Sequence, residues 1–273
     1  MNTQTILVTG ASSGMGKQFA QALLAQGHRV YAVARRLEQM QDLRNQGART
    51  LKMDVTKDED LVSVVDEIQA EAGAIDVLIN NAGFGMYGAM EDTSIEDARY
   101  QFEVNLFGMA RLTQLLLPGM RKQGHGKIIN ISSMGGKIYT PLGSWYHATK
   151  HAVEGWSDCL RLELKPHNID VVIVEPGVIE TEFGDVMTEP MLKRSGQGAY
   201  QSMAESVAKA TRESYQEGGG SKPEVITRLI LKAVAARKPK TRYVAGKYAK
   251  PMMFIRKWFG DRAFDSLILS TVK

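Results

Sequence analysis

Short apolar runs recur along the chain and are separated by longer stretches in which apolar residues repeat with the period of a helix. The apolar runs cover residues 6–8, 30–34, 77–79, 127–131, 171–174 and 243–244. Continuous runs of this length are typical of parallel strands that are covered on both faces. We expect the helical stretches to begin near Gly16, Leu37, Lys57, Ile95, Tyr146 and Pro223. This alternation predicts an α/β fold, with a doubly wound parallel sheet in a three-layer α/β/α sandwich.

Two segments depart from the alternation. The length of 273 residues fits a single domain over residues 1–273. Within it, residues 180–221 are rich in Met, Ser, Gly and Glu, and three consecutive glycines occupy 218–220. This composition predicts a mobile helical substrate lid with a glycine hinge. Residues 246–273 form a C-terminal extension.

Charge and cysteine content exclude several classes of protein. The chain has 34 basic and 30 acidic residues, a formal net charge of +4, and no long run of one sign, so no nucleic-acid partner is expected. Cys159 is the single cysteine, which excludes an internal disulfide. The N-terminus enters its first apolar run without room for a signal peptide, and no apolar run approaches the ~20 residues of a membrane span. We therefore expect a soluble, cytoplasmic protein.

A glycine-rich loop follows the first apolar run. It reads Gly10-x-x-x-Gly14-x-Gly16 and leads into a helical stretch. Glycines allow a tight turn and let backbone N–H groups approach a pyrophosphate at a helix N-terminus, where the helix dipole favours anions. The alternative is an ordinary tight turn between a strand and a helix. The loop favours a Rossmann-type, dinucleotide-binding fold.

The end of the second apolar run indicates which dinucleotide is bound. A cofactor without a 2′-phosphate calls for an Asp or Glu here, to bind the ribose hydroxyls. The chain instead has Arg35 and Arg36, whose guanidinium groups suit a 2′-phosphate. NADP(H) is therefore favoured over NAD(H). The alternative is that both arginines are solvated residues at a helix start.

Tyr146 and Lys150 are candidates for proton transfer. Residues four apart share a helix face, so a phenol and an ammonium can reach one bound molecule together. A phenol has an ordinary pKa near 10, and a nearby cation should lower it toward the working pH. Ser133, thirteen residues before Tyr146, could donate a hydrogen bond to the same substrate oxygen. The alternative for Tyr146 alone is an ordinary tyrosine at the edge of the core.

Three other polar residues stand near these candidates. Asn105 is an amide within an apolar helical stretch, where it must find hydrogen-bond partners, and it could simply be a satisfied packing residue. His147 and His151 lack companions at metal-ligand spacing, so we expect them to be packing or surface residues. No metal site is predicted.

Taken together, these motifs resemble the classical short-chain dehydrogenase/reductase family over residues 5 to 182. The motifs are Thr9-Gly10-x-x-x-Gly14-x-Gly16, Asn80-Asn81-Ala82-Gly83, Asn105, Ser133, Tyr146-x-x-x-Lys150 and Pro176-Gly177. Within the family, the chain looks most similar to the branch of 17β-hydroxysteroid and retinol dehydrogenase-like enzymes.

The resemblance implies a catalytic set and a cofactor site. The implied catalytic residues are Asn105, Ser133, Tyr146 and Lys150, with Asn105 holding a water that links Lys150 to solvent. The implied cofactor-binding residues are Gly10, Ser12, Ser13, Gly14, Met15 and Gly16 at the phosphates, Arg35 and Arg36 at the 2′-phosphate, Asp54 and Val55 at the adenine, Asn81, Ala82 and Gly83 beside the ribose, Tyr146 and Lys150 at the nicotinamide ribose, and Pro176, Gly177, Val178 and Thr181 at the carboxamide.

Residues that follow the strand ends should line the substrate side of the site. They are Met86, Tyr87, Met134, Ile138, Tyr139, Leu142, Trp145, Val178, Phe183 and Met187. Such a set would form an apolar, adaptable cleft for a bulky, poorly polar ketone or aldehyde. The alternative is that half of these residues fill the core.

Two stretches bear on partners. Residues 248–259 combine aromatics, methionines and cations, a pattern that can dock on a membrane surface. A segment that covers the cleft or a subunit contact is favoured over this membrane contact. Apolar residues lie on more than one side of the helical stretches 95–120 and 146–164, and the family implies a homodimer or homotetramer that would bury them.

The leading hypothesis is an NADP(H)-dependent oxidoreductase that interconverts a carbonyl and an alcohol by hydride transfer, with tyrosine as acid and base. Two alternatives are kept. One is a 3-oxoacyl-(carrier protein) reductase, and the other is a non-catalytic NADPH-binding regulator.

Overall fold

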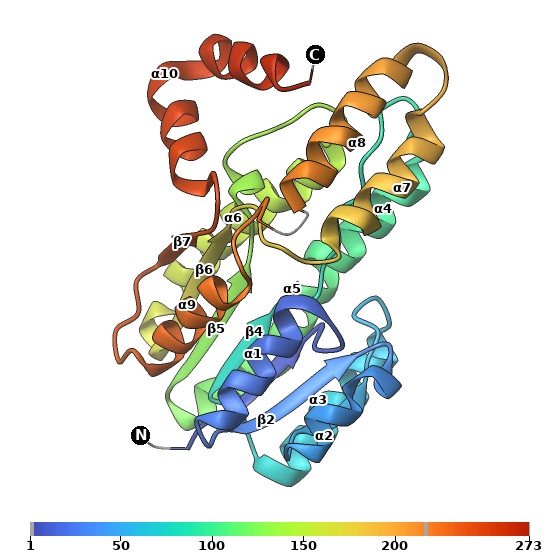
Figure 1. Ribbon diagram of the computed structural model, residues 1–273. Helices are drawn as coiled ribbons and strands as arrows, with labels where there is room; N and C mark the ends of the chain where they lie inside the picture. The colour runs from blue at the N-terminus through green and yellow to red at the C-terminus, as the bar shows by residue number, and fades with distance from the viewer. Residues whose placement is uncertain (1–2, 216–217, 273) are drawn as a thin grey trace.

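Seven parallel strands form one sheet in the computed structural model, which describes residues 3–215 and 218–272 (Figure 1). Their order is β3-β2-β1-β4-β5-β6-β7. The strands are β1 (Thr5–Thr9), β2 (Arg29–Ala34), β3 (Arg49–Lys52), β4 (Val77–Asn80), β5 (Gly126–Ile131), β6 (Ile169–Pro176) and β7 (Arg242–Ala245). Chain order reverses beside β1, where β2 lies on one side and β4 on the other. A crevice at such a reversal is where doubly wound sheets bind ligands.

The helices flank the sheet and extend beyond it. They are α1 (Gly14–Ala25), α2 (Gln41–Asn45), α3 (Asp58–Ala72), α4 (Ile95–Phe102), α5 (Gly108–Gln123), α6 (Ser144–Leu164), α7 (Phe183–Ser195), α8 (Gln201–Tyr215), α9 (Glu224–Ala235) and α10 (Ala249–Ser270). A π-helical turn, η2 (Glu103–Phe107), separates α4 from α5, and short 3₁₀ turns include η3 (Met134–Gly136).

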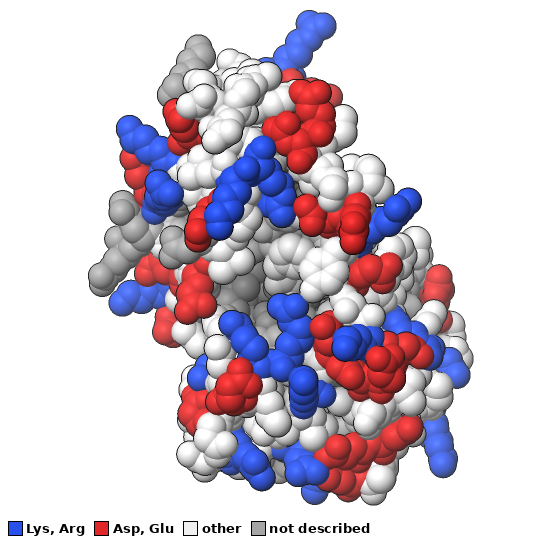
Figure 2. Space-filling model, turned by 90° about the vertical axis from the view of Figure 1, so that its right-hand side faces the viewer, with Lys and Arg blue, Asp and Glu red and all other residues white. Residues whose placement is uncertain are grey.

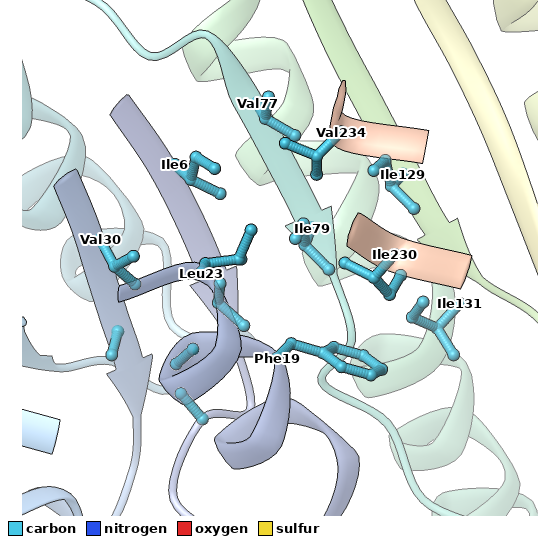
Figure 3. Packing of buried hydrophobic residues seen from close by; sticks show 14 of the residues in the cluster. Ile6, Phe19, Leu23, Val30, Val77, Ile79, Ile129, Ile131, Ile230 and Val234 are labelled. Atoms are coloured by element: carbon cyan, nitrogen blue, oxygen red, sulfur yellow. The ribbon is translucent and has the colours of Figure 1, made fainter. Parts of the chain in front are cut away.

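Alternate residues of each strand pack into opposite layers, because side chains in a strand point to the two faces in turn. Ile6 and Val8 face α1 and α9, whereas Leu7 between them faces α3, α5 and α6. Figure 3 shows the first layer, with labelled side chains from α1, α9 and four strands: Phe19, Leu23, Ile230, Val234, Ile6, Val30, Val77, Ile79, Ile129 and Ile131. Full burial of such a side chain contributes about 1.5–3 kcal/mol. The predicted three-layer α/β fold is confirmed.

The α7–α8 hairpin packs together over the carboxyl ends of the strands. Met187 and Met191 from α7 and Ala204 and Val207 from α8 join an apolar cluster with Tyr146. This hairpin falls within the stretch expected to be a lid. The expected glycine hinge follows residues 216–217, which lie outside the described residues, and the predicted hinge motion stays a prediction.

The C-terminal helix α10 lies at the β7 edge of the molecule (Figure 1). It changes direction at Gly260, whose φ of 76° and ψ of −176° are not helical. Beyond this kink, Phe264 and Ile268 are buried against Ile138. Among the described residues, no helix is both long and apolar enough to cross a membrane.

Candidate active site

A cavity of about 500 Å³ opens at the carboxyl ends of β1, β2 and β4. The face shown in Figure 2 has a hollow near its middle, and basic side chains lie along the lower edge of this hollow. The lining residues are Gly10, Ser12, Ser13, Gly14, Met15, Val33, Ala34, Arg35, Arg36, Met53, Asp54, Val55, Asn81, Ala82, Gly83, Phe84, Tyr100, Val104, Thr181, Glu182, Phe183 and Val186. The structure therefore brings most of the predicted cofactor residues together around one cavity.

The glycine loop has the conformation that its sequence predicts. Gly10 and Gly14 have φ of +66° and +52°, values that other residues adopt only with strain. A Cβ on Gly16 would lie 2.4 Å from the Gly10 carbonyl oxygen and from Asn81 Nδ2, so only glycine fits there. Helix α1 begins at Gly14 with no acidic residue in its first turn. This free helix N-terminus suits an anion.

Asn81 holds the loop in place. Its Nδ2 donates hydrogen bonds to the carbonyl oxygens of Thr9 (3.0 Å) and Gly10 (3.3 Å), and its backbone N–H donates to Thr9 Oγ1. Asn81 also lines the cavity, so it can contact a bound ribose while its side-chain amide supports the loop.

Two exposed guanidinium groups border the cavity beyond the glycine loop. Arg36 Nη2 lies 3.4 Å from Ser13 Oγ, and Arg35 Nη1 donates to the Tyr100 hydroxyl at 3.1 Å. Neither arginine is paired with a carboxylate among the described residues, although many other surface cations are. A phosphate could therefore bind here without displacing an internal ion pair. The loop, the free helix end and these two cations fit a dinucleotide with a 2′-phosphate.

Asp54 and Val55 lie at the far wall of the same cavity. Asp54 Oδ1 accepts hydrogen bonds from the backbone N–H and the hydroxyl of Thr56. These hydrogen bonds fix the turn after β3. The Asp54 carboxylate is therefore already held in position at this wall of the cavity.

Six predicted cofactor residues do not line this cavity, and two of them, Tyr146 and Lys150, lie behind it. Gly16 lies beneath the loop. Pro176 and Gly177 end the pairing of β6 with β7, and the Gly177 N–H donates to the Ala245 carbonyl oxygen at 2.8 Å. Val178 is buried and bridges to Lys247. These residues shape the scaffold, whereas Thr181, which follows them, reaches the cavity.

The expected catalytic residues converge behind this cavity. Lys150 is buried and its Nζ donates to the Ile131 carbonyl oxygen at 2.9 Å. Lys150 Nζ and Asn105 Oδ1 both border Gly83. Ser133 follows β5, and its hydroxyl accepts a hydrogen bond from the Gly135 N–H at 3.0 Å. Tyr146, four residues before Lys150 on α6, is buried.

The Asn105 side chain is fully engaged by protein groups. Its Oδ1 accepts from the Phe84 N–H at 3.0 Å, and its Nδ2 donates to the Phe84 carbonyl oxygen and to Thr149 Oγ1. The amide therefore ties the η2 turn to the loop after β4 and to α6. These bonds agree with the packing alternative for the side chain, and the water-holding role that the resemblance implies stays a prediction.

Burial sets the proton affinity of the two titratable groups. It raises the pKa of Tyr146 above its ordinary value of 10, and Ser133 opposes this rise by hydrogen bonding. Burial also lowers the pKa of Lys150 to about 8, against the favourable charge of Glu154. The expectation that Lys150 lowers the pKa of Tyr146 is therefore wrong for this structure. The physical reason is that desolvation outweighs any attraction to Lys150, whose ammonium is directed to Ile131.

A buried charge cluster lies next to Lys150. Glu154, one helical turn after it, accepts ion pairs from Lys137 (2.9 Å) and Arg242 (3.0 Å). Glu175 is fully buried beside Glu154, and Arg242 Nε lies 3.6 Å from its Oε1. Burial and the neighbouring Glu154 charge raise the pKa of Glu175 to about 7. The sequence carried no signal for this cluster, because its members are distant along the chain.

Most of the residues expected to line the substrate side fall in two separate clusters. Tyr87, Leu142 and Met187 pack with Tyr146 under the hairpin. Ile138, Met134 and Tyr139 pack instead against α10. Phe183 alone of the ten lines the cavity, so the alternative that many of them fill the core is the better description.

The cavity also has walls that the sequence did not predict. They are Phe84, Tyr100, Val104, Glu182 and Val186, together with Val33, Ala34 and Met53. The last three directly follow or end strands, so the rule of strand ends could have found them. His147 is a buried packing residue, as expected: it bonds to the Gly135 carbonyl oxygen and to Thr140, and burial lowers its pKa to about 4. The described residues contain no group of three His, Cys, Asp or Glu side chains placed to hold a metal ion.

Comparisons with known proteins agree with this geometry. The family model for short chain dehydrogenases matches residues 4–191. A 3-ketodihydrosphingosine reductase of Bacteroides thetaiotaomicron is 39% identical over 263 residues, which cover 96% of this chain and 95% of that protein. A short-chain dehydrogenase structure from Streptomyces avermitilis is 33% identical and has a TM-score of 0.79, covering 98% and 95% of the two chains. The closed form of a serine dehydrogenase complexed with NADP+ is 28% identical with a TM-score of 0.78, covering 90% and 96%.

The sheet, the glycine loop and the Tyr–Lys pair define a nicotinamide-dependent oxidoreductase that acts on CH–OH and C=O groups. The chain belongs to the short-chain dehydrogenase/reductase family.

Proposed function

We propose that the protein is an NADP(H)-dependent reductase of bulky, apolar ketones or aldehydes, and that it also catalyses the reverse oxidation. One observation carries the proposal. The cavity has an end suited to anions, formed by the glycine loop, Arg35 and Arg36, and an apolar end at Phe183, behind which Tyr146 lies. A dinucleotide bound from the first end would bring its reactive ring toward Tyr146.

The cofactor-binding residues have separate tasks in this proposal. The N–H groups at the start of α1 bind the pyrophosphate, while Arg35 and Arg36 bind the 2′-phosphate. No carboxylate follows β2 to bind free ribose hydroxyls, which supports NADP(H) over NAD(H). The likeness to a serine dehydrogenase complexed with NADP+ supports the same choice.

Tyr146, Ser133 and Lys150 handle the proton. Tyr146 donates its hydroxyl proton to the carbonyl oxygen, and the Ser133 hydroxyl donates a hydrogen bond to the same oxygen. The bound nicotinamide supplies the hydride. Lys150, whose Nζ lies behind the cavity at Gly83, would bind the nicotinamide ribose. Asn105 positions α6 relative to the loop after β4 through its bonds to Phe84 and Thr149.

The apolar cluster under the hairpin supports a hydrophobic substrate. Tyr87, Leu142, Met187 and Met191 surround Tyr146, and methionines adapt to irregular apolar ligands. The likeness over almost the full chain to a 3-ketodihydrosphingosine reductase supports a ketone on a long alkyl chain. We therefore propose long-chain ketones as the substrate class.

A homo-oligomer is also proposed. Ile95, Phe107 and Leu162 lie on the helices expected to form subunit contacts, and they are 53%, 53% and 66% exposed. Three large apolar side chains in solvent on these helices support burial by a second copy.

The test is NADPH oxidation by the purified protein against a series of ketones of increasing chain length, repeated with Tyr146→Phe. We expect turnover that rises with chain length, and a loss of about 10²–10⁴ in kcat for the variant. NADPH affinity, measured by fluorescence titration, should be unchanged, because the phenol hydroxyl is not a phosphate contact. NADPH binding without turnover of any carbonyl would contradict the enzymatic proposal and favour a binding-only regulator.

A further inference from the structure

Three aromatic side chains project into solvent from the first half of α10. Phe254, Trp258 and Phe259 are 56%, 67% and 64% exposed. The ring centroid of Phe254 lies 6.3 Å from that of Trp258 and 6.3 Å from that of Phe259, so the three rings form one patch. We call these residues, with the flanking Lys250 and Lys257, the α10 patch.

The aromatic residues of the α10 patch are exposed although the same helix packs against the protein through other residues. Other residues of the same half of the helix, Met252, Met253 and Ile255, are partly buried against the cluster of Ile138 and Phe264. Helix α10 therefore has apolar residues packed on the protein and aromatic residues that are exposed. A contiguous aromatic patch on a surface is a common mark of an interaction site.

The charged residues next to the patch along the chain are nearly all positive. Residues 247–262 contain five basic residues and one acidic residue, a net charge of +4, which equals the formal net charge of the whole chain. The acidic residue, Asp261, is paired with Arg256. Lys250, Lys257 and Arg262 have no carboxylate partner among the described residues, and Lys257 Nζ lies 5.2 Å from the Trp258 ring. The partner surface must therefore be both apolar and anionic.

A second copy of this chain does not meet that requirement. A symmetric pair would place the same patch against itself, and so +4 against +4. An anionic lipid surface does meet it, because aromatic rings settle at the headgroup level while lysines and arginines bind lipid phosphates.

The patch also has a structural route to the candidate active site. Beyond Gly260, α10 packs through Phe264 and Ile268 onto Ile138, five residues after Ser133. At the end of the chain, Val272 packs against the cluster that contains Tyr87 and Tyr146. A surface that holds α10 would thus lie beside the apolar end of the site.

We propose that the α10 patch binds the surface of an anionic lipid bilayer and so brings the apolar end of the site to substrates dissolved in that bilayer. Access to substrates in the bilayer rests on the proposed function. Binding to lipid does not, since it needs no turnover.

Co-sedimentation of the full-length protein with vesicles tests the binding. We compare vesicles of phosphatidylcholine alone with vesicles of equal parts phosphatidylcholine and phosphatidylglycerol. We expect binding to the mixed vesicles only, weakened by added salt. The triple variant F254S/W258S/F259S should lose at least about tenfold in affinity, and K250Q/K257Q should lose roughly fivefold per lysine.

Two controls isolate the patch. Met90→Ser removes an apolar side chain that is 61% exposed in the loop between β4 and α4, and Lys238→Gln removes a charge outside α10. Both should bind vesicles as the wild type does. Thermal melting of every variant, with turnover of a short, water-soluble ketone, shows that the fold and basal activity are intact.

The outcomes are distinct. Equal sedimentation of the wild type and the triple variant overturns the proposal. The proposal is also overturned if the wild type binds no vesicles and light scattering shows a dimeric wild type but a monomeric triple variant. The patch is then a subunit interface. Vesicle binding by a protein that turns over no ketone contradicts the proposed function but keeps the lipid surface.

Discussion

The ring of Phe183 lies against the ring of Tyr146, with centroids 5.8 Å apart. Phe183 begins α7 and also lines the cavity, whereas Tyr146 does not line it. The same phenyl ring packs at 5.8 Å from Tyr215 at the end of α8, and a Cβ on Gly85 would lie 2.4 Å from its Cζ. Phe183 thus separates the cofactor end of the cavity from the proposed acid. We therefore expect this side chain to move when a carbonyl approaches Tyr146 from the cavity.

We expect Phe183→Ala to raise kcat/KM for bulky ketones several-fold. Without the phenyl ring, a larger fraction of the enzyme has Tyr146 accessible to substrate. The same change should lower the free energy of unfolding by about 2–3 kcal/mol, because it removes a half-buried aromatic ring from three contacts. Steady-state kinetics and denaturant unfolding measure the two effects. Val186→Ala, which alters an exposed residue on the same cavity wall, is the control and should change neither much. A fall in kcat without a change in KM would show instead that Phe183 positions the substrate.

Arg35→Ala should weaken NADPH binding by roughly 10- to 100-fold, the loss of a charge-assisted contact to a phosphate. NADH affinity should stay within about threefold, because NADH lacks the 2′-phosphate that the guanidinium would bind. Fluorescence titration with both cofactors measures the difference. The matched control is Arg44→Ala on α2, an exposed arginine outside the cavity. Equal losses for the two cofactors would rule out the 2′-phosphate role.

Lys150 gives the enzyme an alkaline limit. Its pKa of about 8 means that the ammonium form is complete well below pH 8 and is lost as the pH rises through that value. We expect kcat/KM to fall over that range, since it reports groups of the free enzyme.

Glu154→Gln removes the carboxylate that stabilises the charged form of Lys150. The pKa of Lys150 should then fall, and the alkaline decline of kcat/KM should move to lower pH. Activity at pH 8 relative to pH 6 should drop by a factor of roughly three to ten. Asp158→Asn is the control, because Asp158 also pairs with Arg242 but is not among the groups that perturb Lys150. An unchanged pH profile in Glu154→Gln would exclude this electrostatic link.

Continuous apolar runs made the central strands predictable, because a strand covered on both faces must be apolar throughout. All six runs lie in strands. Strand β3 was missed because it is a short edge strand whose Arg49 and Lys52 are exposed, so its sequence resembles a surface loop. Similarly, the single helix expected over residues 95–120 is divided by a π-helical turn that no local pattern marks.

The cofactor end of the site was predictable because local constraints determine it. Glycines at positive φ and a helix N-terminus leave a direct trace in the sequence, as at Gly10 and Gly14. The apolar end of the site was not predictable, because it depends on contacts between segments that are distant along the chain. Phe183 meets Tyr146 across 37 positions, and burial reversed the expected direction of the Tyr146 pKa shift. Proton affinity follows desolvation, which a sequence pattern does not report.

The buried carboxylate of Glu175 makes the stability of the fold depend on pH. Its pKa is about 7 in the folded protein, raised from 4.5 chiefly by burial, and its two oxygens accept no hydrogen bond from the described residues. Between pH 4.5 and 7 the folded state keeps this proton while the unfolded state loses it, so rising pH favours unfolding. The stabilising contribution of Glu175 is therefore fully present below about pH 4.5 and lost as the pH passes 7.

We expect Glu175→Gln to raise the free energy of unfolding by on the order of 2 kcal/mol at pH 8 and by much less at pH 5. Denaturant unfolding at the two pH values measures this difference, and Glu163→Gln, which changes an exposed carboxylate on α6, is the control. If Glu175→Gln destabilises the protein equally at both values, then the Arg242 ion pair outweighs the cost of burying the charge.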